Sequence, residues 1–86
     1  MYKINITKKV FKFLLKHKGE KLITSFENSL IILKNNPYRN TLDIKSLKWY
    51  EKIYRLRIWK YRFIYEIIED KLIISFADAD TRWDIY

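Results

Sequence analysis

The sequence contains no cysteine, so disulfide bonds and cysteine-based zinc sites are both excluded. It has a single histidine, His17, which cannot build a multi-histidine metal site or a catalytic pair that needs a second histidine. We therefore expect no metal and no other cofactor. Because a chain without cysteine suits a reducing compartment, we also expect the protein to act in the cytoplasm.

Glycine, proline and long apolar runs are also scarce. With one glycine and one proline, few positions are suited to unusual backbone angles. No apolar run approaches the roughly 20 residues that span a membrane. The N-terminal segment lacks the continuous apolar stretch of a secretory leader, so we expect no signal peptide.

Apolar residues and positive charge are abundant instead. The chain is 49% hydrophobic and 17% aromatic, which is too apolar for a disordered protein. Its 86 residues predict a single small domain, residues 1–86. The net charge of +8 favours a polyanionic partner, namely nucleic acid, an acidic protein or an anionic lipid. A lysine-rich solvated surface would give the same charge.

Apolar periodicity predicts two helices in the first half of the chain. Residues 2–6 alternate as a short strand, and Thr7 is a suitable N-cap for a helix over residues 8–16. Gly19 can take a positive φ after this helix. A second helix is predicted over residues 20–34, with Pro37 just beyond its end. The short link between the helices predicts an antiparallel pair.

The second half reads as a connection followed by strands. Residues 38–48 are predicted to be a connecting stretch, residues 50–58, 61–69 and 71–78 to be strands, and residues 81–86 a short helix or turn. The element order βααβββ predicts an α+β fold. An antiparallel sheet would pack one face on the helix hairpin, with the N-terminal strand added at an edge.

Arginines gather on one face of the predicted central hairpin. Strand alternation places Arg55 and Arg57 on the same side, and a turn closing symmetrically over Trp59 and Lys60 places Arg57 opposite Arg62. Facing like charges are destabilising, so these side chains either lie in solvent or hold an anion. Arg62 could instead pair with a carboxylate on the next strand. The two candidates are Asp78 and Asp80.

Four segments carry a resemblance to a known family: residues 47–48, 54–58, 60–67 and 82–86. The second and third read as a basic strand, a short turn and a Tyr-Arg-x-x-Tyr pattern, and the last places a basic residue before a terminal tyrosine. With the helix pair, they resemble the RelE/ParE superfamily of toxin–antitoxin toxins, RelE-like members in particular. The resemblance implies a ribosome-dependent mRNA endoribonuclease that uses no metal. The ribose 2′-OH is its nucleophile, and a cognate antitoxin neutralises it.

The resemblance also implies roles for individual residues. The positions that match the family's catalytic residues are Arg57, Arg62, Arg82 and Tyr86. The positions expected to bind RNA are Arg55, Lys52, Lys60 and Trp59. Trp59 departs from the family pattern, because the turn usually holds a glycine and a tryptophan resists positive φ. A wider loop that still closes symmetrically is therefore an alternative to the two-residue turn.

Two other functions remain open from the sequence. A ParE-like toxin would inhibit DNA gyrase and need no ribonuclease residues. A non-enzymatic module would use the basic surface only to bind nucleic acid.

Overall fold

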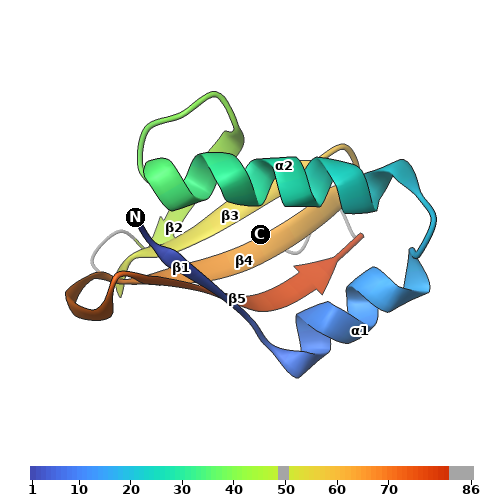
Figure 1. The fold of residues 1–86 in the computed structure, drawn as a ribbon, viewed down its shortest axis with the longest axis horizontal. Coiled ribbons are helices and arrows are strands. Elements are labelled where there is room, and N and C mark those ends of the chain that lie inside the picture. The colour runs from blue at the N-terminus through green and yellow to red at the C-terminus, as the bar shows by residue number, and fades with distance from the viewer. Residues whose placement is uncertain (49–50, 82–86) are drawn as a thin grey trace.

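The computed structural model describes residues 1–48 and 51–81. Figure 1 shows the helices and strands, coloured along the chain. The described residues form five strands, two α-helices and a short 3-10 turn. They are β1 (Lys3–Ile6), α1 (Lys8–Lys16), α2 (Lys21–Asn35), β2 (Asp43–Lys48), β3 (Ile53–Ile58), β4 (Tyr61–Ile68), η2 (Glu69–Lys71) and β5 (Ile73–Asp80). Neither described helix is long and apolar enough to cross a membrane.

The strands form one sheet in the order β1-β5-β4-β3-β2. The predicted α+β class is confirmed, with two refinements. Strand β2 lies within the stretch predicted to be a connection, and β1 pairs with β5 in parallel, so the sheet is mixed. A register shift between Ser46 and Lys48 interrupts the alternation along β2, which is why periodicity alone did not indicate a strand there.

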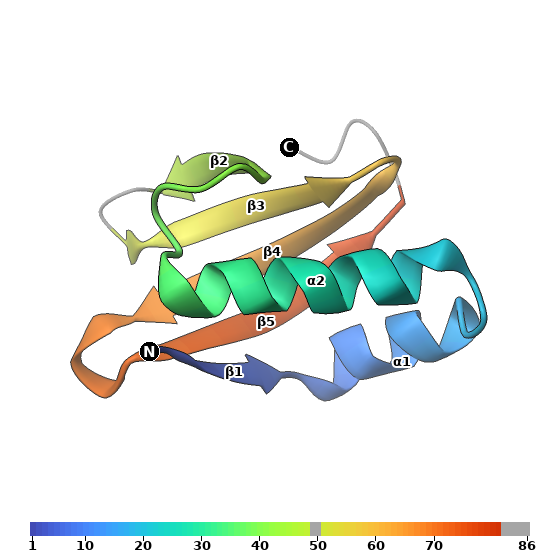
Figure 2. The same cartoon turned by 45° about the horizontal axis from the view of Figure 1, so that its top comes forward.

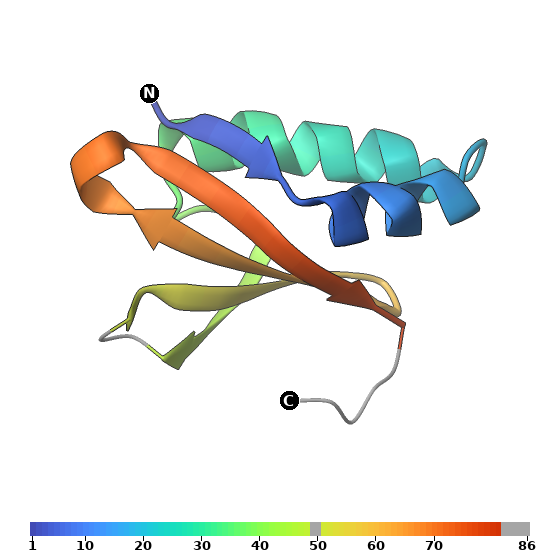
Figure 3. The same ribbon diagram turned by 90° about the horizontal axis from the view of Figure 1, so that it is seen from below.

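Both helices lie on one side of the sheet and run in opposite directions, as Figures 2 and 3 show. Helix α2 buries Leu22, Phe26 and Leu33 against the sheet. The strands contribute the apolar faces predicted from alternation, with Leu56 on β3 and Phe63 and Tyr65 on β4 fully buried. Neither described helix lies on the opposite face, which we call the open face, although Arg62 and Ile64 on that face are buried.

The apolar stripe of α1 is only partly covered. Val10 is fully buried, but Phe11 and Leu15 are 55% and 53% exposed, because this short helix packs mainly on β5. The two exposed side chains line a groove of about 420 Å³ between the helices. Leu14, Ile23 and Leu30 are also part of its lining.

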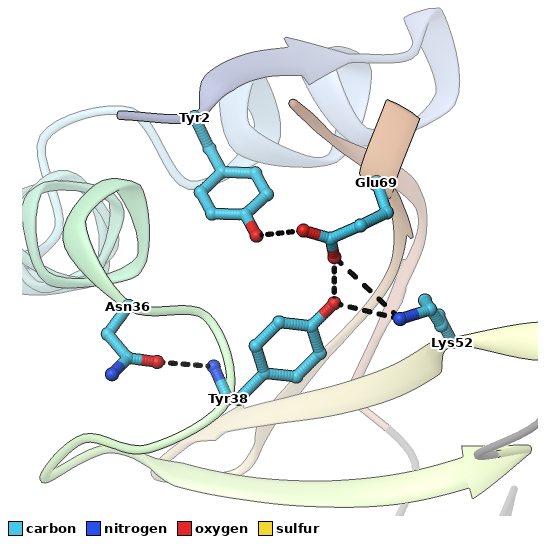
Figure 4. Close-up of polar contacts among 5 residues, drawn as sticks. All are labelled: Tyr2, Asn36, Tyr38, Lys52 and Glu69. Carbon is cyan, nitrogen blue, oxygen red and sulfur yellow. Dashed lines mark hydrogen bonds and ion pairs between the residues drawn. The ribbon is translucent and has the colours of Figure 1, made fainter. Parts of the chain in front are cut away.

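A polar cluster fastens the sheet at the end where the chain begins (Figure 4). The hydroxyl of Tyr2 donates to Glu69 at 2.6 Å, and that of Tyr38 donates to the other oxygen of the same carboxylate. Lys52 lies 3.7 Å from this carboxylate and donates to the Tyr38 hydroxyl at 3.2 Å. This tyrosine–glutamate cluster joins the N-terminal strand, the loop after α2, the start of β3 and the turn after β4.

A second polar contact fastens the other end of the helix pair. The predicted positive φ of Gly19 is confirmed at +86°. The His17 ring packs against Phe13 and Tyr61, and its Nδ1 lies 3.0 Å from Glu20, whose other oxygen accepts from the Tyr61 hydroxyl. At 20% exposure, the His17 side chain is largely covered by these contacts. It ties the α1–α2 loop to the start of β4.

Candidate functional site

A row of four charged residues crosses the open face. In the strand registers Asp43 on β2 is opposite Arg57 on β3, Arg57 is opposite Arg62 on β4, and Arg62 is opposite Asp80 on β5. Directly opposed residues share a face, with Cβ atoms roughly 4.5–5.5 Å apart. The predicted pairing of Arg57 with Arg62 is confirmed, and the structure adds a carboxylate on each side. We call these four residues the charge row.

Asp43 holds two arginines at once. One carboxylate oxygen lies 2.9 Å from an Nη of Arg55, and the other lies 2.8 Å from Nε of Arg57. The Arg55 side chain is only 12% exposed, so its guanidinium is largely withdrawn from solvent. The two contacts fix the orientation of both guanidinium groups. The negative charge of the Asp43 carboxylate also offsets part of their positive charge.

Arg62 is the most buried charged residue described, at 6% exposure. Its register partner is Asp80, and each of these two residues has interaction partners. Asp78, the other carboxylate considered for Arg62, pairs with Lys9 at 2.9 Å instead. With three arginines (55, 57 and 62) and two aspartates (43 and 80), the formal charge is 3 − 2 = +1. The open face is therefore less cationic here than the arginines alone predict.

The hairpin after β3 closes over two residues. Ile58 pairs with Tyr61, so Trp59 and Lys60 form the whole turn and the wider loop does not occur. Trp59 takes φ +54°, the conformation that usually calls for glycine, and its side chain is 57% exposed. The two-residue turn fixes the register that sets Arg57 against Arg62.

A pocket of about 710 Å³ lies beside this turn. We call it the hairpin-tip pocket. It brings together helix α2, the loop before β2 and the tip of the β3–β4 hairpin, and its lining residues are Ser25, Ser29, Thr41, Leu42, Asp43, Arg57, Ile58, Trp59 and Lys60. Two residues of the charge row, Asp43 and Arg57, thus face it as well.

The structure does not bring all the predicted site residues together. Lys52 lies at the start of β3, roughly 17 Å along the strand from Arg57 at about 3.3 Å per residue, and it contacts the tyrosine–glutamate cluster. Arg82 and Tyr86 lie outside the described residues. The described residues contain no group of His, Asp and Glu side chains placed to hold a metal ion.

The sequence reasoning missed Asp43 as a member of this site. The sequence held little signal for a strand here, because the apolar residues Ile44 and Leu47 of β2 are three positions apart rather than two. The α2 serines that line the hairpin-tip pocket were also missed. They had no recognisable sequence signal, because polar residues on the side of an amphipathic helix are ordinary.

No family model matches the sequence. The chain is 33% identical over 86 residues to a Methanocaldococcus jannaschii protein that carries the toxin name RelE1, covering 99% of this chain and 94% of that protein.

Solved structures agree with this sequence match. RelE in the archaeal RelE–RelB complex from Pyrococcus horikoshii superposes with a TM-score of 0.85 at 26% identity, over 96% of this chain and 97% of that one. The intact Escherichia coli RelBE toxin–antitoxin complex superposes with a TM-score of 0.76 at 14% identity, over 96% and 99% of the two chains. The second likeness shows the fold alone.

Proposed function

Because the chain belongs to the RelE family of toxins from toxin–antitoxin systems, we propose that it is a ribosome-dependent endoribonuclease that cleaves messenger RNA without a metal. The observation that carries the proposal is the juxtaposition of Arg57 and Arg62 at the centre of the charge row. Guanidinium groups remain charged and bind phosphate through paired donors. A phosphodiester lying over this pair would compete with Asp43 for the Nε donor of Arg57.

The proposed reaction is an internal phosphoryl transfer. The ribose 2′-OH loses its proton and attacks the adjacent phosphorus, and the bond to the 5′-oxygen of the next nucleotide breaks. The products are a 2′,3′-cyclic phosphate and a 5′-hydroxyl, which receives a proton. Negative charge grows on the phosphoryl oxygens in the transition state, and positioned donors of this kind are worth about 3–4 kcal/mol each. We assign that role to Arg57 and Arg62, with Arg55 positioning a neighbouring phosphate.

The remaining roles follow from the family resemblance. Arg82 would add a further phosphate contact. Tyr86 would act as the general base, which requires cations to lower its pKa from the ordinary value of about 10. Lys60, Trp59 and the more distant Lys52 would contact the RNA outside the scissile position.

The partners proposed for this chain are the ribosome with its message and a cognate antitoxin, all in the cytoplasm. The Pyrococcus horikoshii and Escherichia coli relatives were solved as complexes with RelB, which supports an antitoxin partner. The apolar groove between α1 and α2 is open to a partner segment, and its lining includes Lys18 and Glu27. Four further exposed lysines lie on α1 itself: Lys8, Lys9, Lys12 and Lys16. An antitoxin segment with apolar residues on one side and acidic residues beside them fits this surface.

A translation assay with primer extension tests the proposal. We expect cuts in ribosome-bound message that follow the reading frame and disappear in Arg62→Ala. Arg39→Ala is the matched control, because Arg39 is exposed on the loop after α2 and lies outside the charge row. Intact message in the presence of translating ribosomes and wild-type protein would contradict the proposal.

One observation favours a second candidate, a ParE-like inhibitor of DNA gyrase. The two carboxylates of the charge row reduce its positive charge, and a gyrase inhibitor would not need that charge to clasp a scissile phosphate. Loss of supercoiling activity with intact message would support this candidate. If neither message nor supercoiling is affected, the chain acts as a non-enzymatic binding module.

A further inference from the structure

We propose that the hairpin-tip pocket is a nucleobase subsite, in which a base of the bound RNA stacks on the indole of Trp59 while the adjoining phosphate lies at Arg57. The inference rests on the proposed function, since it assigns a specificity element to the same RNA. It gives Trp59 the role of holding the base of the nucleotide that accompanies the scissile phosphate, and leaves selection among bases to the polar groups of the pocket.

The exposed side chain at the turn is the first argument. Trp59 takes φ +54°, a left-handed conformation that Lys52 and Leu72 share in other turns of the sheet. Glycine would form the same two-residue turn without strain. The indole is 57% exposed and makes no ring contact with another described residue, so packing within the described structure does not account for it. A flat aromatic surface facing a pocket offers stacking to any base.

The walls of the pocket are held in place without a ligand. In the loop before β2, Asn36 accepts hydrogen bonds from the backbone amides of Tyr38 and Arg39, both at 3.0 Å. Asn40 in turn donates to the Asn36 carbonyl at 2.8 Å and accepts from the Leu42 amide at 2.9 Å. The pocket wall that includes Leu42 is therefore fixed by side-chain contacts to the backbone.

The opposite wall is supplied by α2, where the Ser29 hydroxyl donates to the Ser25 carbonyl at 2.9 Å. With its hydrogen committed to that carbonyl, the Ser29 oxygen is left as an acceptor facing the pocket lining. The pocket thus combines an aromatic surface and apolar contacts at Leu42 and Ile58 with hydroxyl groups at Ser25, Ser29 and Thr41. This is the mixture that a base requires, a stacking face with polar groups at its edge.

The charges connect this pocket to the proposed site of cleavage. Arg57 belongs both to the charge row and to the pocket lining, so a phosphate at the row places its nucleotide at the pocket entrance. Lys60 lies on the other side of Trp59. Hydrogen bonds from His17 and Tyr61 lower the pKa of the Glu20 carboxyl, and the charge of Lys60 contributes to the same shift. The Nζ of Lys60 lies 5.4 Å from the centre of the Tyr61 ring. A phosphate on each side of one stacked base would meet Arg57 and Lys60 in turn.

Binding of short oligonucleotides tests the subsite directly. In a Trp49→Phe/Trp83→Phe protein, Trp59 is the only indole and reports on its own environment by fluorescence. We expect saturable quenching by a 2′-deoxy hexanucleotide, which lacks the attacking hydroxyl, and about 10-fold weaker binding of an abasic hexamer, as loss of one stacked base implies. Equal affinity for both oligomers would overturn the proposal.

Cleavage maps provide a second readout in the protein that keeps Trp49 and Trp83. Trp59→Ala is expected to redistribute the cut positions on one ribosome-bound message, whereas Trp59→Tyr keeps an aromatic ring and restores the wild-type pattern. Lys71→Ala, an exposed lysine on η2 far from the pocket, is the charge control. An unaltered pattern in Trp59→Ala would overturn the subsite and leave the proposed nuclease intact.

Failure of the proposed nuclease function and failure of the nucleobase subsite give different experimental results. If wild-type protein cuts no message yet discriminates the base-bearing from the abasic hexamer, the proposed function fails and the nucleobase subsite stands. If Trp59→Ala changes neither cleavage nor hexamer binding but abolishes neutralisation by the antitoxin, the pocket is a protein-docking surface and the subsite proposal is wrong.

Discussion

At the scale of single residues, Asp43 changes the chemistry of the candidate site most. Its carboxylate contacts both Arg55 and Arg57, and it holds their donors in a fixed orientation on the open face. Fixed orientation favours a positioned phosphate, whereas the negative charge opposes it. The balance between these two effects can be measured.

Asp43→Asn should bind RNA more tightly than wild type. Removing one negative charge beside two guanidinium groups is expected to steepen the dependence of log affinity on log salt by about one ion. The free energy of unfolding should fall by about 1 kcal/mol, because Asp43 is half exposed while Arg55 is largely buried. Titration of a 2′-deoxy oligonucleotide at several salt concentrations gives the first quantity and urea unfolding the second.

Asp70→Asn removes an acidic residue from the exposed turn η2 and serves as the control for general charge. Equal affinity and equal salt dependence for Asp43→Asn and Asp70→Asn would show that Asp43 does not modulate the phosphate site.

Arg62 should be irreplaceable by lysine. Arg62→Ala is expected to lower the rate of message cleavage by about 10²–10³-fold, the usual cost of losing one transition-state donor. Arg62→Lys keeps the charge but loses the planar pair of donors, so most of the loss should remain. Single-turnover cleavage on stalled ribosomes measures the rates.

Because Arg62 is buried, the melting temperature of each Arg62 variant must accompany its rate. Full activity of a folded Arg62→Ala protein would remove this residue from the mechanism.

At the scale of elements, the positive φ of Trp59 in the hairpin turn has an energetic cost that substitutions at this position can measure. Trp59→Gly and Trp59→Ala both remove the indole, but only alanine keeps a Cβ at φ +54°. Trp59→Gly should therefore be more stable than Trp59→Ala by about 1 kcal/mol. Urea unfolding of the two variants measures this difference, and equal stability would show that the turn relaxes without cost.

The tyrosine–glutamate cluster should make stability depend on pH at both extremes. The hydrogen bond to Glu69 raises the pKa of Tyr2 to about 12, and burial together with the same carboxylate raises the pKa of Tyr38 to about 12. Since the folded state binds these protons more tightly, their contribution is complete below about pH 10 and is lost as pH rises to about 12. Hydrogen bonds from both tyrosines lower the pKa of Glu69, so its contribution is lost as pH falls through the acidic range.

Comparison of wild type with Tyr2→Phe/Tyr38→Phe isolates this effect from lysine titration. The difference in urea midpoint between the two proteins should shrink between pH 10 and pH 12. A difference that stays constant over that range would contradict the assigned hydrogen bonds.

The helices and strands also show which features of the fold were predictable from the sequence. Alternation placed Arg55 and Arg57 on one face, and the assumption of a turn closing symmetrically over Trp59 and Lys60 gave the β3–β4 register that sets Arg57 against Arg62. The carboxylate beside them was missed because the irregular β2 was predicted to be a connection. Backbone preference argued against a two-residue turn at Trp59, yet the sheet on both sides imposes it. Local propensity was outweighed by tertiary pairing in that case.

At the scale of the whole molecule, most of the net positive charge lies away from the charge row. The net charge is +8, but the charge row with Arg55 accounts for only +1 of it. Five lysines lie on α1 or the loop after it, the helix that also exposes Phe11 and Leu15: Lys8, Lys9, Lys12, Lys16 and Lys18. The exposed apolar residues of α1 thus lie among basic residues, which suits a partner segment that is both apolar and acidic.

Phe11→Glu/Leu15→Glu should therefore escape neutralisation while remaining toxic. Both side chains are more than half exposed, so their replacement should cost little stability, whereas two new carboxylates would repel an acidic partner segment. Growth with and without co-expressed antitoxin measures the effect. Lys12→Glu, on the same helix but outside the groove lining, is the control, and full neutralisation of the double variant would place the antitoxin elsewhere.

The chemistry of the cut is the most direct test of the account, because the arginines are proposed to stabilise attack by the ribose hydroxyl. A ribosome-bound message should be cleaved to a 2′,3′-cyclic phosphate and a 5′-hydroxyl, and a single 2′-deoxy nucleotide before the scissile phosphate should block that cut alone. Continued cleavage at the deoxy position, or products with a 3′-hydroxyl and a 5′-phosphate, would contradict the proposed mechanism.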